Sequence, residues 1–213
     1  MRISLISAAL LASSLASAAT PVDGWYSSVF GGYTYLPGNI NNYSDLYIHR
    51  GQASYNNGYN VGGRIGYQSN PLRYEVEYTY LRGNLQKFDI NYINQLDVSG
   101  YSSGNLLMAN IYYDFPEMLP AISPYLGLGI GYAYLQASLA SSGPVTPSFF
   151  SISDSAFAYQ GTLGITYNFA ENYAVNLAYR YVATDTPASF GTNFQAHLAS
   201  VGAVYRFDQV NYK

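Results

Sequence analysis

Glu75 and Glu77 are separated by one residue, a spacing that could serve acid–base chemistry. Alternate residues of a β-strand point to the same face, about 7 Å apart, and paired carboxylates at such distances carry out acid–base catalysis in some hydrolases. Two bases, Arg64 and Arg73, lie nearby in the sequence. Because a buried carboxylate needs an opposite charge, ion pairing explains the two glutamates better than catalysis does.

The two histidines offer little further chemistry. His197 and Ser200 are three residues apart, so a strand places them on opposite faces and they cannot form a nucleophilic pair. His49 follows a polar segment and is expected to be a solvated loop residue. The absence of cysteine excludes disulfides, cysteine nucleophiles and cysteine-ligated zinc. We expect no enzymatic activity, no cofactor and no metal site.

The segment that carries both glutamates, residues 72–82, alternates between two kinds of side chain. Its apolar, tyrosine-rich positions are Leu72, Tyr74, Val76, Tyr78 and Tyr80. Its polar positions are Arg73, Glu75, Glu77 and Thr79. This period of two predicts a β-strand with one apolar face and one charged face. The function then depends on which solvent each face meets.

The composition fits neither an ordinary soluble domain nor a helical membrane protein. Charged residues make up 10% of the 213 residues and aromatic residues 17%, whereas soluble domains carry about 25% charged residues. No apolar run reaches the roughly 20 residues of a membrane helix. A sheet with one face in lipid and one polar face accounts for both observations. The net charge of −3 gives no support to nucleic-acid binding.

The N-terminal residues 1–18 have the features of a cleaved secretory signal peptide. Arg2 provides the positive charge, residues 3–12 are apolar, and residues 16–18 read Ala-Ser-Ala, a typical cleavage pattern. We expect the remaining residues, 19–213, to form a single domain.

Eight alternating segments follow, and their length of about 10 to 14 residues suits tilted membrane strands. They span residues 24–36, 59–68, 72–82, 104–115, 125–136, 156–169, 173–183 and 194–207. We predict an all-β fold, an eight-stranded antiparallel up-and-down transmembrane β-barrel. No face is assigned to the first segment, because Gly31 and Gly32 suggest a bulge there.

The connections alternate between short turns and long polar stretches, the pattern of an outer-membrane barrel. We predict four extracellular loops, at residues 37–58, 83–103, 137–155 and 185–193. All nine prolines fall outside the predicted strand interiors. A ladder that crosses lipid requires this placement, because proline cannot donate a backbone hydrogen bond.

The charged residues in the interiors of the predicted strands all share the small or polar face, whereas Arg82 falls on the apolar register at the last position of its segment. We predict that they form a network in the lumen, with the members Arg64, Arg73, Glu75, Glu77, Asp114, Arg180 and Arg206. A basic residue that faces lipid at mid-membrane costs about 2 to 4 kcal/mol, so the charge-free face should meet lipid. The predicted lipid-facing residues are Tyr74, Val76, Tyr78, Leu128, Ile130, Leu163, Ile165, Leu177, Tyr179 and Val201. Because side chains just fill an eight-stranded barrel, the network is expected to be structural, with pore lining as the alternative.

Five short motifs carry a resemblance to a known family. They are GWY at 24–26, YYDF at 112–115, PYLGLGIGY at 124–132, AYRY at 178–181 and VYRF at 204–207. In their order and spacing the chain resembles the small outer-membrane β-barrel proteins, the group that includes opacity-type proteins and the barrel domain of OmpA. One departure is that residues 208–213 follow Phe207, whereas the family usually ends on the aromatic residue that the assembly machinery recognises.

The resemblance implies a barrel in a Gram-negative outer membrane, with both termini in the periplasm and the long loops outside the cell. It implies outer-membrane lipids, lipopolysaccharide and the barrel-assembly machinery as partners. Three functions stay open: a structural or surface-interaction barrel whose loops contact an external ligand or host surface, a narrow porin-like channel, and a soluble lipocalin-like barrel with a ligand cavity.

Overall fold

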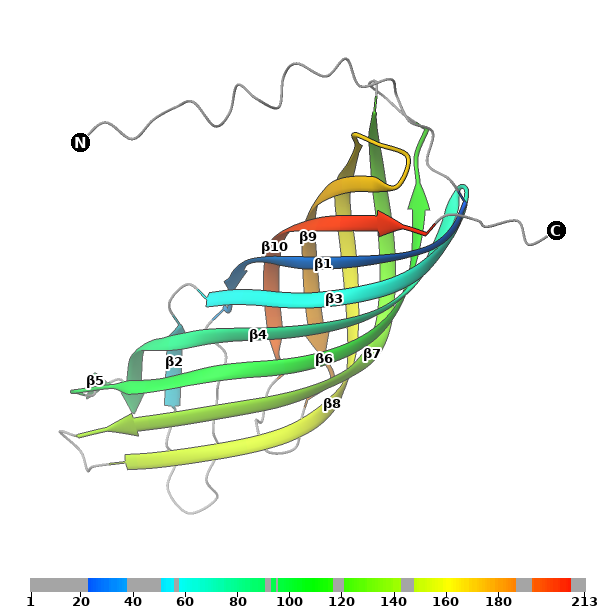
Figure 1. Cartoon of the computed structure of the whole chain (residues 1–213). Helices are drawn as coiled ribbons and strands as arrows, with labels where there is room; N and C mark the ends of the chain where they lie inside the picture. The colour runs from blue at the N-terminus through cyan, green and yellow to red at the C-terminus, as the bar shows by residue number, and fades with distance from the viewer. Residues whose placement is uncertain are drawn as a thin grey trace, which may run out of the picture.

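The computed structural model describes residues 23–37, 51–55, 58–90, 93–94, 96–116, 121–142, 148–186 and 193–207. Eight of its strands form a closed antiparallel barrel, in which β4 pairs with β6 to complete the ring (Figure 1). These strands are β1 (Gly24–Tyr35), β3 (Gly58–Ser69), β4 (Leu72–Ile90), β6 (Ser99–Asp114), β7 (Ile122–Ser141), β8 (Ser148–Asn168), β9 (Tyr173–Thr184) and β10 (Gln195–Arg206). The predicted eight-stranded up-and-down barrel is confirmed. No helix in the described part of the chain is long and apolar enough to cross a membrane.

The two ends of the barrel differ. At one end, which we call the turn end, short connections join β3 to β4, β6 to β7 and β8 to β9, and β1 starts beside the end of β10. At the opposite end, the projecting end, β4, β6, β7 and β8 extend well past the other strands (Figure 1, lower left). Two short strands, β2 (Gly51–Tyr55) and β5 (Ile93–Asn94), pair with the extension of β4.

This extension corrects two of the predicted loops. Residues 83–103 and 137–155 are largely strand, because β4 continues to Ile90, β6 begins at Ser99, β7 continues to Ser141 and β8 begins at Ser148. The predicted loop 37–58 contains β2, and most of 185–193 lies outside the described residues. Residues 1–18, His49 and residues 208–213 also lie outside them.

The reason for the error is an inversion of the hydropathy pattern within single strands. In β4, Tyr74 to Tyr80 present apolar or aromatic groups to the outside, whereas Arg82, Asn84 and Gln86 continue the same outward row with polar groups. The inward row changes in the opposite sense, from Glu75 and Glu77 to Leu81 and Leu85. The alternation therefore persists, but the apolar side becomes the inner side.

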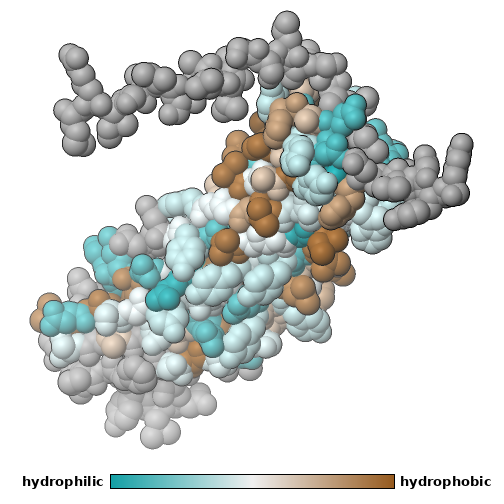
Figure 2. Space-filling view, viewed as in Figure 1, coloured by the Kyte–Doolittle hydropathy of each residue, from teal (hydrophilic) through white to brown (hydrophobic). Residues whose placement is uncertain are grey.

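The same inversion occurs in the three strands that follow β4 around the ring. The outward row becomes polar between Leu107 and Asn105 in β6, between Tyr134 and Gln136 in β7, and between Phe157 and Ser155 in β8. Tyr80, Asn105, Tyr134 and Ser155 form one row of paired residues. The hydropathy pattern of the four strands therefore inverts at nearly the same level, within about one residue pair. Figure 2 agrees: hydrophobic colours gather over the half of the molecule nearer the turn end.

The interior is filled in two layers. Polar and charged side chains occupy the half nearer the turn end. Toward the projecting end, a cluster of buried apolar residues spans the barrel, namely Leu36, Leu81, Leu85, Leu106, Met108, Ala133, Leu135, Ala137, Ala158, Val182, Ala196 and Leu198. This second layer is the core of the projecting end, and it resembles the core of a soluble sheet protein in composition.

Glycines make room for the aromatic rings that point inward. Tyr26 is paired with Gly66, Phe30 with Gly62, Tyr112 with Gly127 and Tyr125 with Gly164. A Cβ added at any of these four glycines would lie 2.2 to 2.6 Å from an atom of the paired ring. Each inward aromatic ring therefore lies over a neighbouring glycine, a pairing that fills a narrow barrel without displacing the backbone.

Two smaller expectations also change. The register of β1 with both neighbours runs without a shift through Gly31 and Gly32, so no bulge occurs there. Pro124 is the third residue of β7 and not part of a turn. Its carbonyl accepts a hydrogen bond from the Phe115 N–H at 2.9 Å, just past the end of β6, where the missing proline donor interrupts no β6–β7 ladder.

The glycine–aromatic pairing predicts that Gly127→Ala destabilises the barrel by about 1 to 3 kcal/mol, as overpacking does. The added Cβ would lie 2.2 Å from Tyr112 Cδ1 and 2.7 Å from the Ile111 carbonyl oxygen. The matched control is Gly161→Ala, where no atom lies within 4 Å of the added Cβ. Urea unfolding in lipid vesicles, followed by the fluorescence of the single tryptophan, Trp25, measures both. Equal stability of the two variants would contradict the pairing.

Candidate functional site

The barrel exterior carries an apolar band. All ten residues predicted to face lipid point outward and are exposed, from 41% for Tyr179 to 67% for Leu128. Exposed aromatic residues flank the aliphatic ones. Those nearer the turn end are Trp25, Tyr67, Tyr74, Tyr113, Phe115, Tyr167, Phe169, Tyr173, Tyr205 and Phe207. Those nearer the projecting end are Tyr33, Tyr35, Tyr59, Tyr78, Tyr132, Tyr134, Phe157, Tyr159 and Tyr179.

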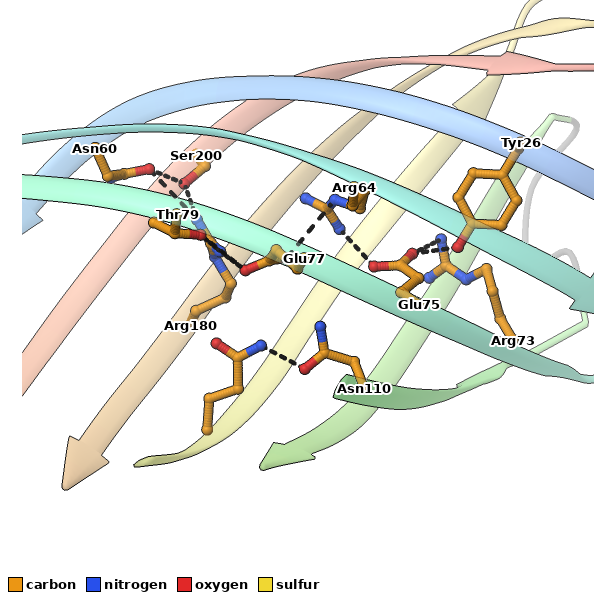
Figure 3. A network of polar contacts seen from close by, with 11 residues as sticks. Tyr26, Asn60, Arg64, Arg73, Glu75, Glu77, Thr79, Asn110, Arg180 and Ser200 are labelled. Atoms are coloured by element: carbon orange, nitrogen blue, oxygen red, sulfur yellow. Dashed lines mark hydrogen bonds and ion pairs between the residues drawn. The ribbon is translucent and has the colours of Figure 1, made fainter. Parts of the chain in front are cut away.

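Six of the seven predicted lumenal charges lie in one continuous series of ion pairs, which we call the charge chain. Figure 3 shows its members from Arg73 to Arg180. Its order is Asp114, Arg73, Glu75, Arg64, Glu77 and Arg180, so that acids and bases alternate. The successive N···O distances from Asp114 to Glu77 are 3.2, 3.4, 3.3 and 3.7 Å, and Glu77 directly contacts Arg180. Three acids and three bases make the charge chain neutral.

The strand geometry explains this series. Arg73, Glu75 and Glu77 are alternate residues of β4, so all three point into the barrel. Arg64 on β3 is the direct cross-strand partner of Glu77, and it also reaches Glu75. Arg180 reaches Glu77 from β9, across the lumen. The charge chain therefore joins strands on opposite sides of the ring.

Neutral groups complete the surroundings of Arg180. Its guanidinium donates to Thr79 Oγ1 at 3.1 Å and to Ser200 Oγ at 3.1 Å. Ser200 in turn donates to Asn60 Oδ1 at 2.7 Å. Both Glu77 and Arg180 are fully buried. A buried charge with this number of partners holds the position of every strand that contributes one.

Several aromatic residues in the network were not predicted from the sequence. The Phe30 ring contacts two guanidinium groups. Its centre lies 4.6 Å from the guanidinium carbon of Arg64 and 4.4 Å from that of Arg180. The Tyr26 hydroxyl donates to Glu75. Both residues come from β1, whose faces the sequence pattern leaves unassigned because Gly31 and Gly32 suggest a bulge. The sequence signal for these inward rings was the pair Gly62 and Gly66 on the adjacent β3, because glycines leave room for large side chains beside them.

The seventh predicted charge, Arg206, lies apart from the charge chain. Its Nη2 donates to Asn168 Oδ1 at 2.7 Å, near the turn end. No carboxylate within the described residues forms an ion pair with it. The seven predicted residues thus comprise four arginines and three acids, and within this set the excess positive charge is on Arg206.

The structure places the catalytic candidates apart. His197 faces outward and shares a hydrogen bond of 2.7 Å with the Tyr179 hydroxyl, whereas Ser200 points inward to Asn60. Glu75 and Glu77 both form ion pairs with arginines. Among the residues that the structure describes, no group of three or more His, Cys, Asp or Glu side chains could hold a metal ion. In this arrangement the two glutamates take part in the ion pairs that join the strands.

Comparison with known proteins agrees with this geometry. The sequence profile described as the outer membrane protein beta-barrel domain matches residues 5–207. The chain belongs to this family. Membership of this family places the barrel in the cell outer membrane, which rules out the soluble lipocalin-like alternative.

The outer-membrane barrel is also similar to proteins of several bacteria. An uncharacterised protein of Brucella abortus is 27% identical over 175 residues, which cover 72% of this chain and 59% of that protein. The chain thus spans about three fifths of the length of the curated relatives that it matches. The crystal structure of Neisserial surface protein A gives a TM-score of 0.56 at 20% identity, over 86% of this chain and 97% of that one. A major outer membrane protein of Thermus thermophilus gives 0.55 at 12% identity, over 86% and 99%. At these identities the structures show the shared fold.

The outward position of Val76 predicts that Val76→Arg impairs membrane assembly, at a cost of about 2 to 4 kcal/mol. The matched control is Gln86→Arg, which adds the same charge to the same outward row of β4, past the point of inversion. The fraction of protein that folds into lipid vesicles measures the effect. Equal yields from the two variants would show that residue 76 does not face hydrocarbon.

The charge chain predicts that Glu77→Gln destabilises the barrel by about 3 to 5 kcal/mol, because Arg64 and Arg180 both lose a buried partner. The matched control is Glu171→Gln in the exposed β8–β9 turn, with an expected change within about 0.5 kcal/mol. Urea unfolding in vesicles compares them. If Glu77→Gln behaves like the control, the charge chain does not hold the strands together.

Proposed function

We propose that this outer-membrane barrel is a surface-interaction protein whose projecting end contacts a ligand or host surface outside the cell. The turn end, where β1 begins and β10 ends, then lies in the periplasm. The apolar band contacts outer-membrane lipids and lipopolysaccharide, and the barrel-assembly machinery inserts the chain. This orientation agrees with the general rule that short turns of outer-membrane barrels are periplasmic and long segments extracellular.

The inversion of the hydropathy pattern is the observation that carries the proposal. Strand residues past the inversion have a polar outward row and a largely apolar inward row, with Ser102 and Asp154 as exceptions, and this arrangement suits water on the outside. The projecting end is therefore a folded platform above the membrane, with its own core. A barrel that served only to cross the membrane would not need four strands that continue beyond the apolar band.

The platform has features of a recognition surface. The Arg82 guanidinium lies 4.1 Å from the centre of the Tyr101 ring, on the polar outward face. β9 pairs with β8 only over Ala158–Asn168, whereas β7 pairs with it from residue 148 onward. Among the described strands, none pairs with residues 148–153 on the side away from β7. An open edge of this kind can accept an extended segment of a partner through main-chain hydrogen bonds.

The filled interior opposes the alternative of a narrow channel. The charge chain occupies the half of the lumen nearer the turn end, and the apolar cluster that includes Leu81, Leu135 and Leu198 spans the other half. A conducting path would need to open both layers. We therefore favour surface interaction over conduction.

The proposal predicts that shortening the β7–β8 hairpin removes binding but leaves assembly intact. The variant replaces residues 139–150 with Asn-Gly, which joins the paired residues Ser138 and Ser151 by a tight turn. Bacteria that display the variant should lose at least about nine tenths of their attachment to cultured host cells and extracellular-matrix proteins, as expected when a binding surface is deleted.

The control is a barrel with residues 117–120 scrambled, at the opposite end of β7, which should attach like the wild type. Surface protease treatment of intact cells gives the orientation, because a cleavage site inserted after Ser142 should be cut and one inserted at 117–120 should not. Full attachment by the shortened variant would overturn the surface-interaction proposal.

A further inference from the structure

A cavity of about 250 Å³ lies at the turn end of the barrel. Its lining residues come from the turns and from the last inward-facing positions of the strands. They are Gln68, Asn70, Arg73, Asp114, Phe115, Pro116, Ser123, Thr166, Asn168 and Arg206. The cavity is separate from the projecting end, and the proposed surface interaction does not use it.

The charge on the cavity wall is not balanced. Arg73 and Asp114 pair with each other at 3.2 Å and belong to the neutral charge chain. Arg206, which also lines the cavity, is 5% exposed, and within the described part of the chain its side chain donates to the neutral amide of Asn168. Its Nε and Nη1 atoms are buried and have no hydrogen-bond partner within the described residues. A buried guanidinium without an opposite charge is costly, so a negative group in the cavity would stabilise it.

The remaining lining residues suit such a group. Asn168 Nδ2 has no partner in the described part of the chain. Gln68, Ser123 and Thr166 add buried amide and hydroxyl groups to the wall. The planar guanidinium presents several N–H donors that match the oxygens of a phosphate or carboxylate group.

We propose that the turn-end cavity binds a small oxyanion of the phosphate type, held by Arg206 and assisted by Asn168. The anion supplies an opposite charge beside Arg206, so that Arg206 has a partner like those of the other three arginines. Free phosphate and the phosphate of a lipid headgroup share this chemistry. Either could reach a cavity at the turn end of the barrel.

The test is isothermal titration of the full chain in an uncharged maltoside detergent, with inorganic phosphate as the probe and chloride used to hold the ionic strength constant. We expect saturable binding at one site per barrel. Arg206→Gln should weaken it by about ten-fold or more, as loss of one member of a buried charge pair does. Arg82→Gln, which removes an arginine over Tyr101 on the outward face of β4, should bind like the wild type.

A second variant separates anion binding from a merely structural role of Arg206. Asn168→Asp retains Arg206 and places a carboxylate where an amide oxygen now lies 2.7 Å from Nη2. This internal charge should replace the anion, so phosphate binding should weaken by about ten-fold or more although the barrel remains folded. A structural role alone would leave the affinity of Asn168→Asp for phosphate unchanged.

A parallel titration with monomeric dihexanoyl phosphatidylglycerol identifies the source of the anion. Binding of inorganic phosphate supports the site with a free anion as its ligand, and binding of the lipid alone supports it with a headgroup as its ligand. Absence of saturable binding by both probes would overturn the proposal. Binding that is the same in the wild type, Arg206→Gln and Asn168→Asp would also overturn it.

Discussion

Each strand of this barrel must present one face to hydrocarbon and the other to a narrow interior, and the rest of the structure depends on this constraint. Charges are excluded from the outward face because hydrocarbon cannot solvate them. They are therefore collected inside, where each needs a partner. The alternating order of acids and bases from Asp114 to Arg180 meets that need with neutral pairs. Because these residues come from four different strands, the same pairs that neutralise the charges also fix the strands relative to one another.

Where the strands leave the membrane, the outward face no longer meets hydrocarbon, and polar residues appear on it. Past Tyr80, β4 turns its polar side chains outward and its leucines inward without any break in the ladder. One strand thus fits lipid along its first part and water along its second part, because its polar and apolar faces are exchanged. This exchange gives the projecting end a core and a polar surface, the two properties of a platform that recognises something outside the cell. At the other end, Arg206 leaves one positive charge unbalanced beside a cavity, which points to an anion from outside the chain.

The fold could be predicted from the sequence because alternation is a local signal, and the long outward rows of Tyr, Leu, Ile and Val repeat it eight times. The inward position of Glu75 and Glu77 followed from the same signal. The extensions of β4 and β7 were taken for loops because the expected pattern, apolar outside, no longer held there. The contacts of Phe30 with Arg64 and Arg180 could not be predicted, since they depend on strand pairing across the ring and on glycines of a neighbouring strand.

The most direct test of the account is nitroxide scanning along β4, with single cysteines introduced from residue 73 to residue 87 of a chain that has no native cysteine. Collision with oxygen, which dissolves in lipid, and with a water-soluble nickel chelate reports the solvent at each position of the protein in vesicles. We predict that residues 74, 76, 78 and 80 contact oxygen, that residues 82, 84 and 86 contact the chelate, and that the buried odd-numbered positions from 73 to 85 contact neither. Continued oxygen contact at 82 to 86, or chelate contact at 75 and 77, would contradict the account.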